Sequence, residues 1–271
     1  ETPWRYRNKV QVPVGKDKSG KMICGFYRAQ THDIIAFTEC HLQSTIQNDI
    51  LTFITEFYND KRIFPESLRW ILLKRGDISE EIMVVLITSE KSLILKEQLV
   101  KELSYTFPQI QAIVQNINTR QDNVILGDEE IALTPKSTIQ DTLGHCVFSI
   151  SAKSFYQVNP IQAKVLYDKV VEFADFNSTD TVMDLYCGVG TIALYVSRHV
   201  NHVIGVEVVE QAIKDAQQNA LLNHIDNVSW YTGDAGEVAK KLASSDIKVD
   251  IIIVDPPRKG LNLETIEAIV G

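Results

Sequence analysis

The sequence is poor in cysteine and lacks any long apolar run. Its four cysteines, among 271 residues, lie far apart and form no CxxC pair. They define neither a complete zinc site nor a disulfide framework, and they fit scattered buried thiols in a reducing compartment. No stretch approaches the roughly 20 apolar residues of a membrane span, and the N-terminus lacks the apolar core of a signal peptide. These absences predict a cytoplasmic protein with no membrane partner.

An overall excess of positive charge is missing too, because the net charge is -8. The charge is nevertheless uneven. Residues 1–28 carry seven basic and two acidic side chains, a balance of +5, whereas residues 151–271 carry ten basic and sixteen acidic ones, a balance of -6. A local basic arm can meet phosphates, since the local field matters more than the sum. A solvated hairpin with lysines on its turn explains the same charges.

The two halves of the chain have different secondary-structure patterns. In the first half, turn-rich segments join apolar runs into two hairpins, and apolar residues at three- and four-residue spacing predict two helices. The hairpins comprise 8–15 with 21–28 and 68–75 with 81–88, and the helices cover 43–59 and 92–107. We therefore expect an α+β domain over 1–153.

After about residue 153, helix and strand alternate strictly, which is typical of a doubly wound parallel sheet. The expected strands are 181–186, 202–208, 227–234 and 249–257, and the expected helices are 160–174, 190–199, 209–223 and 235–243. This predicts an α/β domain over 154–271 with about four parallel strands.

An acidic residue falls at the end of each of these four strands. Asp184, Glu207, Asp234 and Asp255 should all line one edge of the sheet, where such folds bind ligands. A carboxylate after the second strand suits the hydroxyls of a ribose, and one after the third suits an adenine amine. The fourth, Asp255, faces the reacting end of the ligand.

A glycine loop follows the first of these strands. Gly188 and Gly190 let the backbone turn sharply and approach a ligand closely. With Ala193 and Glu207 they also fit a nicotinamide dinucleotide site, so an oxidoreductase stays an open alternative. The negative charge of Asp184 would repel a pyrophosphate at the start of the following helix, but it suits the ammonium group of S-adenosylmethionine.

A rigid turn, Asp255-Pro256-Pro257-Arg258, closes the fourth strand. Its two prolines fix the backbone and remove two amide donors. Related D/N-P-P turns that end in an aromatic residue serve the methylation of exocyclic amines. Because Arg258 stands in the aromatic position, we expect a target that is not an amine.

Five motifs of the sequence are similar to those of a known family. In their order and spacing, "SFYQVNP", "DLYCGVGTIAL", "GVEVVEQAI", "YTGDAGEV" and "DPPRKG" resemble the S-adenosylmethionine-dependent RNA uracil-5 methyltransferases. The segments "YRNKVQVPVG" and "GFYRAQTHDII" are similar to the central domain of that family. The resemblance implies a Rossmann-like class I methyltransferase domain after an α+β central domain. It also implies methylation of uridine carbon 5 in RNA, with 23S ribosomal RNA favoured and tRNA as the alternative, by a monomer.

The resemblance assigns residues to two ligands. For S-adenosylmethionine it implies Gln157, Tyr186, Gly188, Gly190, Glu207, Asp234 and Asp255. For RNA we expect Arg5, Arg7, Lys9 and Phe155, the aromatic ring by stacking on a splayed base.

The family acts through a cysteine that adds to carbon 6 of uracil, followed by attack of carbon 5 on the methyl group. Its nucleophile and base come after a later strand, so we expect both beyond Gly271 and expect this chain to be inactive alone. Cys187 is expected to be a packing thiol instead. Cys40 matches one of four cysteines that hold a [4Fe-4S] cluster in many members, and the other three would precede Glu1. The chain would then be truncated at both ends.

A third interpretation remains open beside the methyltransferase and the oxidoreductase. The missing nucleophile and the basic hairpin also fit a non-catalytic RNA-binding module.

Overall fold

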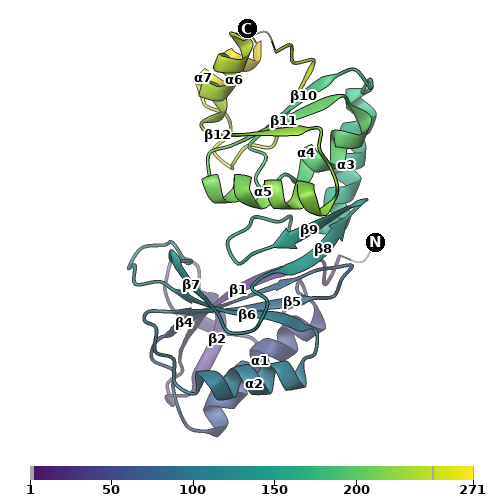
Figure 1. Ribbon diagram of the computed structural model, residues 1–271. Coiled ribbons are helices and arrows are strands. Elements are labelled where there is room, and N and C mark those ends of the chain that lie inside the picture. Colours follow the sequence, from purple (N-terminus) through teal and green to yellow (C-terminus); the bar gives the residue numbers. More distant parts are fainter. Residues whose placement is uncertain (1–2, 246, 271) are drawn as a thin grey trace. The chain divides into compact units, whose positions relative to one another are not determined.

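The computed structural model describes residues 3–245 and 247–270. The chain forms two compact units, residues 1–141 with 151–153 and residues 142–150 with 154–271 (Figure 1). Within the described ranges, none of the helices combines the length and apolar character needed to cross a bilayer.

The first unit is built on a seven-stranded sheet with the order β3-β2-β1-β4-β5-β6-β7. Its strands are β1 (Lys9–Lys16), β2 (Met22–Tyr27), β3 (Ile34–Ala36), β4 (Leu68–Arg75), β5 (Ile82–Thr88), β6 (Ile110–Ile117) and β7 (Glu129–Ala132). The pairs β1/β2 and β4/β5 are antiparallel, so both predicted hairpins are confirmed. Only β5/β6 is parallel among the pairs of this sheet as described, and α2 (Lys96–Thr106) connects those two strands.

Helix α1 (Thr45–Asp60) and helix α2 pack on one face of this sheet. Ser44 and Gln47 form a capping box at the start of α1, and Gln47 also donates to the carbonyl of Asn8 at 3.1 Å. Ile50 and Ile54 of α1 are fully buried against the sheet. Spacing of four residues places these side chains on one face of the helix, which fixes that face toward the core.

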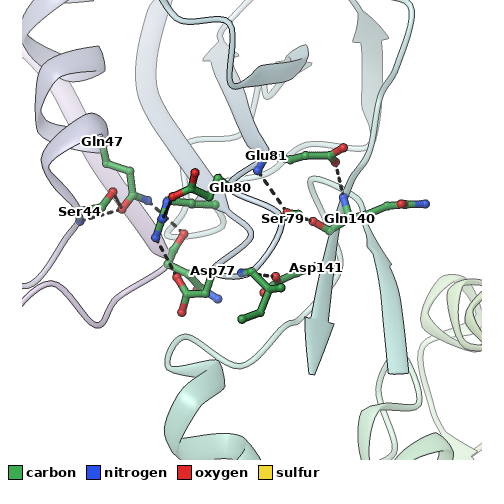
Figure 2. Close-up of polar contacts among 11 residues, drawn as sticks. Ser44, Gln47, Asp77, Ser79, Glu80, Glu81, Gln140 and Asp141 are labelled. Atoms are coloured by element: carbon green, nitrogen blue, oxygen red, sulfur yellow. Dashed lines mark hydrogen bonds and ion pairs between the residues drawn. The ribbon is translucent and has the colours of Figure 1, made fainter. Parts of the chain in front are cut away.

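A polar network fixes the turn between β4 and β5 to residues 140 and 141 (Figure 2). The Ile78 N–H donates to Asp141 Oδ1 at 2.9 Å, and the Gln140 N–H donates to Glu81 Oε2 at 2.7 Å. Arg75 pairs with Asp77 at 3.1 Å. Burial nevertheless raises the pKa of Asp77 to about 6, against the opposing effect of Arg75. Each buried acid here has a partner in its own unit.

The second unit contains a four-stranded parallel sheet with the order β12-β11-β10-β13. Its strands are β10 (Thr181–Leu185), β11 (His202–Glu207), β12 (Val228–Thr232) and β13 (Ile251–Val254). Its helices are α3 (Pro160–Ala174), α4 (Thr191–Val196), α5 (Glu210–Leu222), α6 (Ala235–Ala243) and α7 (Leu263–Val270), with a 3-10 turn at Ser197–His199. The predicted Rossmann-like α/β fold with four parallel strands is confirmed.

The structure also differs from the expected elements. The pattern did not predict β3, β6, β7, α7 or the separate two-stranded sheet of β8 (Ile139–Leu143) and β9 (Cys146–Ile150). Helix α2 begins at Lys96 rather than at residue 92, because Leu95 has a left-handed φ of 58° that ends the preceding turn. Helix α4 is shorter than expected, since its last turn tightens into the 3-10 helix.

Candidate cofactor site

The loop between β10 and α4 has an unusual backbone. Tyr186, Gly188 and Gly190 have φ angles of 65°, 55° and 82°. A Cβ on Gly190 would lie 2.6 Å from Cη2 of Trp230, whereas a Cβ on Gly188 would meet nothing within 4 Å. Gly190 is therefore required by packing, and Gly188 leaves open space beside the loop. Tyr186 holds a strained conformation for a non-glycine residue, a feature that concentrates at functional sites.

Glu207, the last residue of β11, ties this loop to the neighbouring strand. Its carboxylate accepts the N–H of Gly188 at 3.2 Å and the N–H of Val209 at 2.9 Å. Both bonds satisfy amides that no helix or sheet uses. The side chain is held at the carboxyl end of the sheet.

Two further acids stand at the ends of the next strands. Asp234 is the N-cap of α6, and its Oδ1 accepts from the N–H groups of Gly236 at 2.9 Å and Glu237 at 3.3 Å. Asp255 directly follows β13, and its Oδ2 accepts from Gln157 Nε2 at 3.4 Å. The "SFYQVNP" segment is thereby brought to the same edge as the strand ends.

Asp184 departs from the expectation that all four acids line one open edge. It lies within β10, paired with Gly205 on one side and Ile253 on the other, and its exposed fraction is 0%. Its Oδ2 accepts the Ala193 N–H at 2.9 Å, while Oδ1 is buried with no hydrogen-bond partner among the described atoms. Burial raises its pKa to about 8, helped by the charges of Asp255 and Glu207. An unsatisfied buried oxygen is costly, so it suits a donor or a cation that arrives with a ligand.

A cavity of about 610 Å³ opens at this edge. Six of the seven predicted cofactor residues line it, namely Gln157, Tyr186, Gly188, Glu207, Asp234 and Asp255. Gly190 does not line it and packs behind the loop. The volume lies within the usual range for a bound small molecule or cofactor.

The lining also includes residues that the sequence did not single out. Ile192 and Val208 supply apolar wall beside Pro256 of the predicted rigid turn, and Asn262 also lines the cavity. Asn262 Oδ1 also caps α7 by accepting the Thr265 N–H at 2.8 Å. An asparagine just before an apolar run is a helix-start signal, and it was the available clue to this segment.

The acids around the cavity lack cationic partners. In the described chain, no lysine or arginine nitrogen lies within 4.0 Å of the carboxylates of Glu207, Asp234 or Asp255. Lys259 lines the cavity without forming such a pair. The site therefore offers hydrogen-bond acceptors and negative charge to a ligand that carries donors and positive charge.

Cys187 lies in the loop but is a packing thiol in this structure. Its side chain is 6% exposed, and burial raises the pKa of the thiol far above its usual value. Its Sγ lies 3.2 Å from the position of a Cβ on Gly205. A thiol in this state carries no thiolate near neutral pH, and the thiolate is the nucleophile.

The predicted RNA residues fall in both units. In the first unit Arg5 pairs with Glu39 at 2.5 Å, whereas Arg7 and Lys9 form no ion pair within the described residues. In the second unit Phe155 is 65% exposed and lines the cavity. The assignment of these residues to RNA stays a prediction.

Cys40, the predicted iron-sulfur ligand, is half-buried. Its backbone is held by Asn48, whose Oδ1 accepts the Cys40 N–H at 2.9 Å and whose Nδ2 donates to the Cys40 carbonyl at 3.2 Å. Across residues 3–245 and 247–270 there is no group of three or more histidine, cysteine or acidic side chains that could hold a metal ion. The cluster also stays a prediction.

Comparisons with known proteins agree with this geometry. The family model described as tRNA (Uracil-5-)-methyltransferase matches residues 5–271. Among curated proteins, an "Uncharacterized RNA methyltransferase" of Oceanobacillus iheyensis is 40% identical over 100% of this chain and 61% of its own length. Another of that description, from Halalkalibacterium halodurans, is 42% identical over 99% of this chain and 60% of its own length.

Among solved structures, one similar protein is a Pyrococcus abyssi tRNA (uracil-54, C5)-methyltransferase in complex with S-adenosyl-L-homocysteine. It is 25% identical, with a TM-score of 0.80 over 99% of this chain and 64% of that protein. The chain thus spans about three fifths of the length of the curated relatives that it matches.

Proposed function

We propose, since this chain belongs to the tRNA (uracil-5-)-methyltransferase family, that the cavity of its second unit binds S-adenosylmethionine. One observation carries the proposal. Carboxylates without cationic partners gather at the cavity, and a buried oxygen of Asp184 beside them lacks a partner. S-adenosylmethionine supplies both positive charge and hydrogen-bond donors, so it matches this set of acceptors.

Different residues would contact different parts of the cofactor. Glu207 would accept the ribose hydroxyls, and Asp234 would accept from the adenine amine. Gln157 and Asp255 would border the reacting end. The bound cofactor supplies an electrophilic methyl group, and this chain supplies its orientation.

We assign the reaction to carbon 5 of uridine in RNA. In such a reaction a cysteine thiolate adds to carbon 6, and carbon 5 then takes the methyl group from sulfur. A base next removes the proton from carbon 5, and the bond between cysteine and carbon 6 breaks to restore the ring. Cys24, Cys146 and Cys187 are all buried with a raised pKa and do not suit this role. As the family resemblance implies, we place the nucleophile and the base outside residues 1–271.

We further propose ribosomal RNA as the substrate, with tRNA as the competing candidate. The similarity of "YRNKVQVPVG" and "GFYRAQTHDII" to the ribosomal RNA branch of the family supports the first. The family description and the Pyrococcus abyssi protein support the second. Transfer of labelled methyl from S-adenosylmethionine to purified 23S ribosomal RNA and to tRNA transcripts, followed by nucleoside analysis for 5-methyluridine, decides between them.

Calorimetric titration of the natural full-length protein tests the cofactor assignment. S-adenosylmethionine should bind the wild type, and the Asp255→Ala variant should bind it at least tenfold more weakly. Asp250→Ala is a matched control, because Asp250 is exposed at the opposite end of the same strand, where it pairs with Lys248. Absence of binding by the folded wild type, or tight binding of NADH in its place, would contradict the proposal.

A further inference from the structure

A buried tyrosine of α3 lies behind the wall of the cofactor cavity. Tyr167 is 1% exposed and is not one of the described residues that line the cavity. Its hydroxyl oxygen lies 2.9 Å from Oγ1 of Thr191, the first residue of α4, and the Gln157 side chain also forms a hydrogen bond to this hydroxyl. Because Gln157 and Thr191 both line the cavity, one buried hydroxyl joins two parts of its wall.

The position of Tyr167 on α3 explains how its hydroxyl reaches back to Gln157. Asn159 caps α3, which begins at Pro160, so Gln157 lies just before the helix. Ala163 and Tyr167 are buried, and their spacing of four residues places them on one face. Side chains of a helix lean toward its N-terminus, so the long ring of Tyr167 points toward the segment that carries Gln157.

Gln157 relies on side-chain contacts for its orientation. Residues 154–159 form neither helix nor strand, and the Gln157 side chain is half-buried. Its Nε2 atom donates to Asp255 Oδ2 at 3.4 Å, which is longer than the usual N–H···O distance, and Asp255 is exposed. A free glutamine side chain loses much rotamer freedom when a ligand fixes it. A buried partner that fixes it beforehand removes this cost from ligand binding.

The Tyr167 hydroxyl is itself fixed. The rings of Tyr167 and Tyr195 pack with centroids 5.4 Å apart and an interplanar angle of 66°. Tyr195 follows Thr191 by one turn of α4, so Tyr167 is held at two points of that helix. Burial raises the pKa of Tyr167 to about 12, so the hydroxyl stays neutral near pH 7 and can both donate and accept. The Tyr195 hydroxyl instead donates to Asp168, an exposed residue of α3.

We propose that Tyr167 is a positioning residue of the S-adenosylmethionine site, whose hydroxyl, held by Thr191, orients Gln157 for the cofactor without touching the cofactor itself. The inference rests on the proposed function, because it assumes that this cavity holds S-adenosylmethionine. A purely structural role would require only that the buried hydroxyl have a partner, and Thr191 alone meets that need. The second bond, to a cavity residue outside any helix or strand, is what joins Tyr167 to ligand binding.

Calorimetric titration of the full-length protein with S-adenosylmethionine tests this inference. Tyr167→Phe keeps the ring and removes the hydroxyl, so it should bind the cofactor about 5- to 30-fold more weakly, which corresponds to about 1–2 kcal/mol. Tyr195→Phe is the matched control, because it removes the hydroxyl of the neighbouring buried ring, which bonds to Asp168 instead. Its affinity should stay within about twofold of the wild type.

A double-mutant cycle with Gln157→Ala separates positioning from a general effect on folding. If the hydroxyl acts through Gln157, Tyr167→Phe should weaken binding by about twofold at most in the Gln157→Ala background. Urea unfolding of each variant measures its stability separately. Equal losses in the two backgrounds, or wild-type affinity of Tyr167→Phe, would overturn the inference.

A second pair of variants keeps the test decisive should Tyr167→Phe fail to fold. Thr191→Ser keeps the hydroxyl that holds Tyr167 and should bind the cofactor more tightly than Thr191→Val, which removes it. Equal affinities of these two variants would overturn the inference. A folded wild type that binds no S-adenosylmethionine would refute the proposed function and this inference with it, whereas a wild type that binds it no better than Tyr167→Phe would refute the inference alone.

Discussion

The two units differ in the charged groups that stand without ion-pair partners at their predicted ligand residues. In the first unit Arg7 and Lys9 have no carboxylate within 4.0 Å among the described residues. In the second unit, as far as the structure describes it, Glu207 and Asp255 have no cation, and a buried oxygen of Asp184 has no hydrogen-bond partner. Buried polar groups are normally paired, so the unpartnered buried oxygen of Asp184 carries more weight here than Arg7 and Asp255, which are exposed. The acids at the cavity of the second unit are the groups on which the proposed cofactor site rests.

Two aspartates with a raised pKa, one in each unit, also differ in their partners. Asp77 is paired with Arg75, and Asp141 beside it accepts the Ile78 N–H, so that acidic site is satisfied internally (Figure 2). Asp184 is more deeply buried, and the Ala193 N–H donates to one of its two oxygens. Burial raises the pKa of both Asp77 and Asp184, but only the pKa of Asp184 is raised further by acids that line a cavity, Asp255 and Glu207. A raised pKa therefore indicates a ligand site only together with such geometry.

The largest expected effect compares two glycines, one from each unit. Gly190 and Gly20 have nearly equal φ angles of 82° and 84°. A Cβ on Gly190 would clash with Trp230 at 2.6 Å, whereas one on Gly20 would meet nothing within 4 Å. Gly20→Ala should cost about 1–2 kcal/mol of backbone strain, and Gly190→Ala should cost about 2–5 kcal/mol because overpacking adds to it. Denaturant unfolding measures both, and equal costs would show that the loop repacks freely.

The next effect tests the acids of the second unit. Glu207→Gln keeps the size of the side chain but removes the charge, and Glu207→Ala also removes the acceptors of two backbone N–H groups. A hydrogen bond to a charged group contributes about 1.5–3 kcal/mol, so Glu207→Ala should weaken S-adenosylmethionine binding about 10- to 150-fold. Glu207→Gln should weaken it less.

The control for Glu207 is Glu210→Gln. Glu210 is the first residue of the helix that follows, and it pairs with Lys214 at 2.8 Å on the surface. Cofactor affinity within twofold of the wild type is expected, measured by the same titration. A comparable loss in both variants would mean that general charge, rather than the position of Glu207, sets the affinity.

The sequence predicted the second unit better than the first, for a physical reason. Strict alternation of helix and strand allows few topologies, so four strand ends could be placed on one edge. The first unit depends in part on non-local pairing, as in the β1/β4 pair. Strand β6 pairs in parallel with β5 across a helix, and β3 is only three residues long. Neither gives the hairpin pattern that a single sequence reveals.

Prediction of the cofactor site from the sequence is limited in the same way. Periodicity placed Glu207, Asp234 and Asp255 at strand ends, and all three line one cavity. It could not reveal that Asp184 is buried, because that follows from β10 being flanked by strands on both sides. Nor could it reveal the contact between Tyr167 and Thr191, which depends on the packing of α3 against α4.

A smaller effect concerns the proton on Asp184. Its pKa is raised to about 8, so the carboxyl is largely protonated at pH 7 in the free protein. A bound cation favours the charged form and lowers the pKa, so S-adenosylmethionine should release up to about one proton on binding at pH 7. Titrations in phosphate and Tris, whose ionisation enthalpies differ, measure the release. It should vanish above the free pKa and in Asp184→Asn, and buffer-independent heats at pH 7 would contradict the assignment.

The smallest effect tests the internally satisfied acid of the first unit. The pKa of Asp77 is raised to about 6 in the folded protein, against an ordinary value near 3.8. A raised carboxyl pKa stabilises the fold most below the unfolded value, and that stability is lost as pH rises through 6. The shift of about two units sets a ceiling near 3 kcal/mol, which solvent screening at Arg75 reduces to about 1 kcal/mol. Asp77→Asn cannot titrate, so its stability relative to the wild type should rise by about that amount between pH 4 and pH 7.5, measured by urea unfolding. S-adenosylmethionine affinity should stay unchanged in this variant, because Asp77 pairs with Arg75 and does not line the cavity.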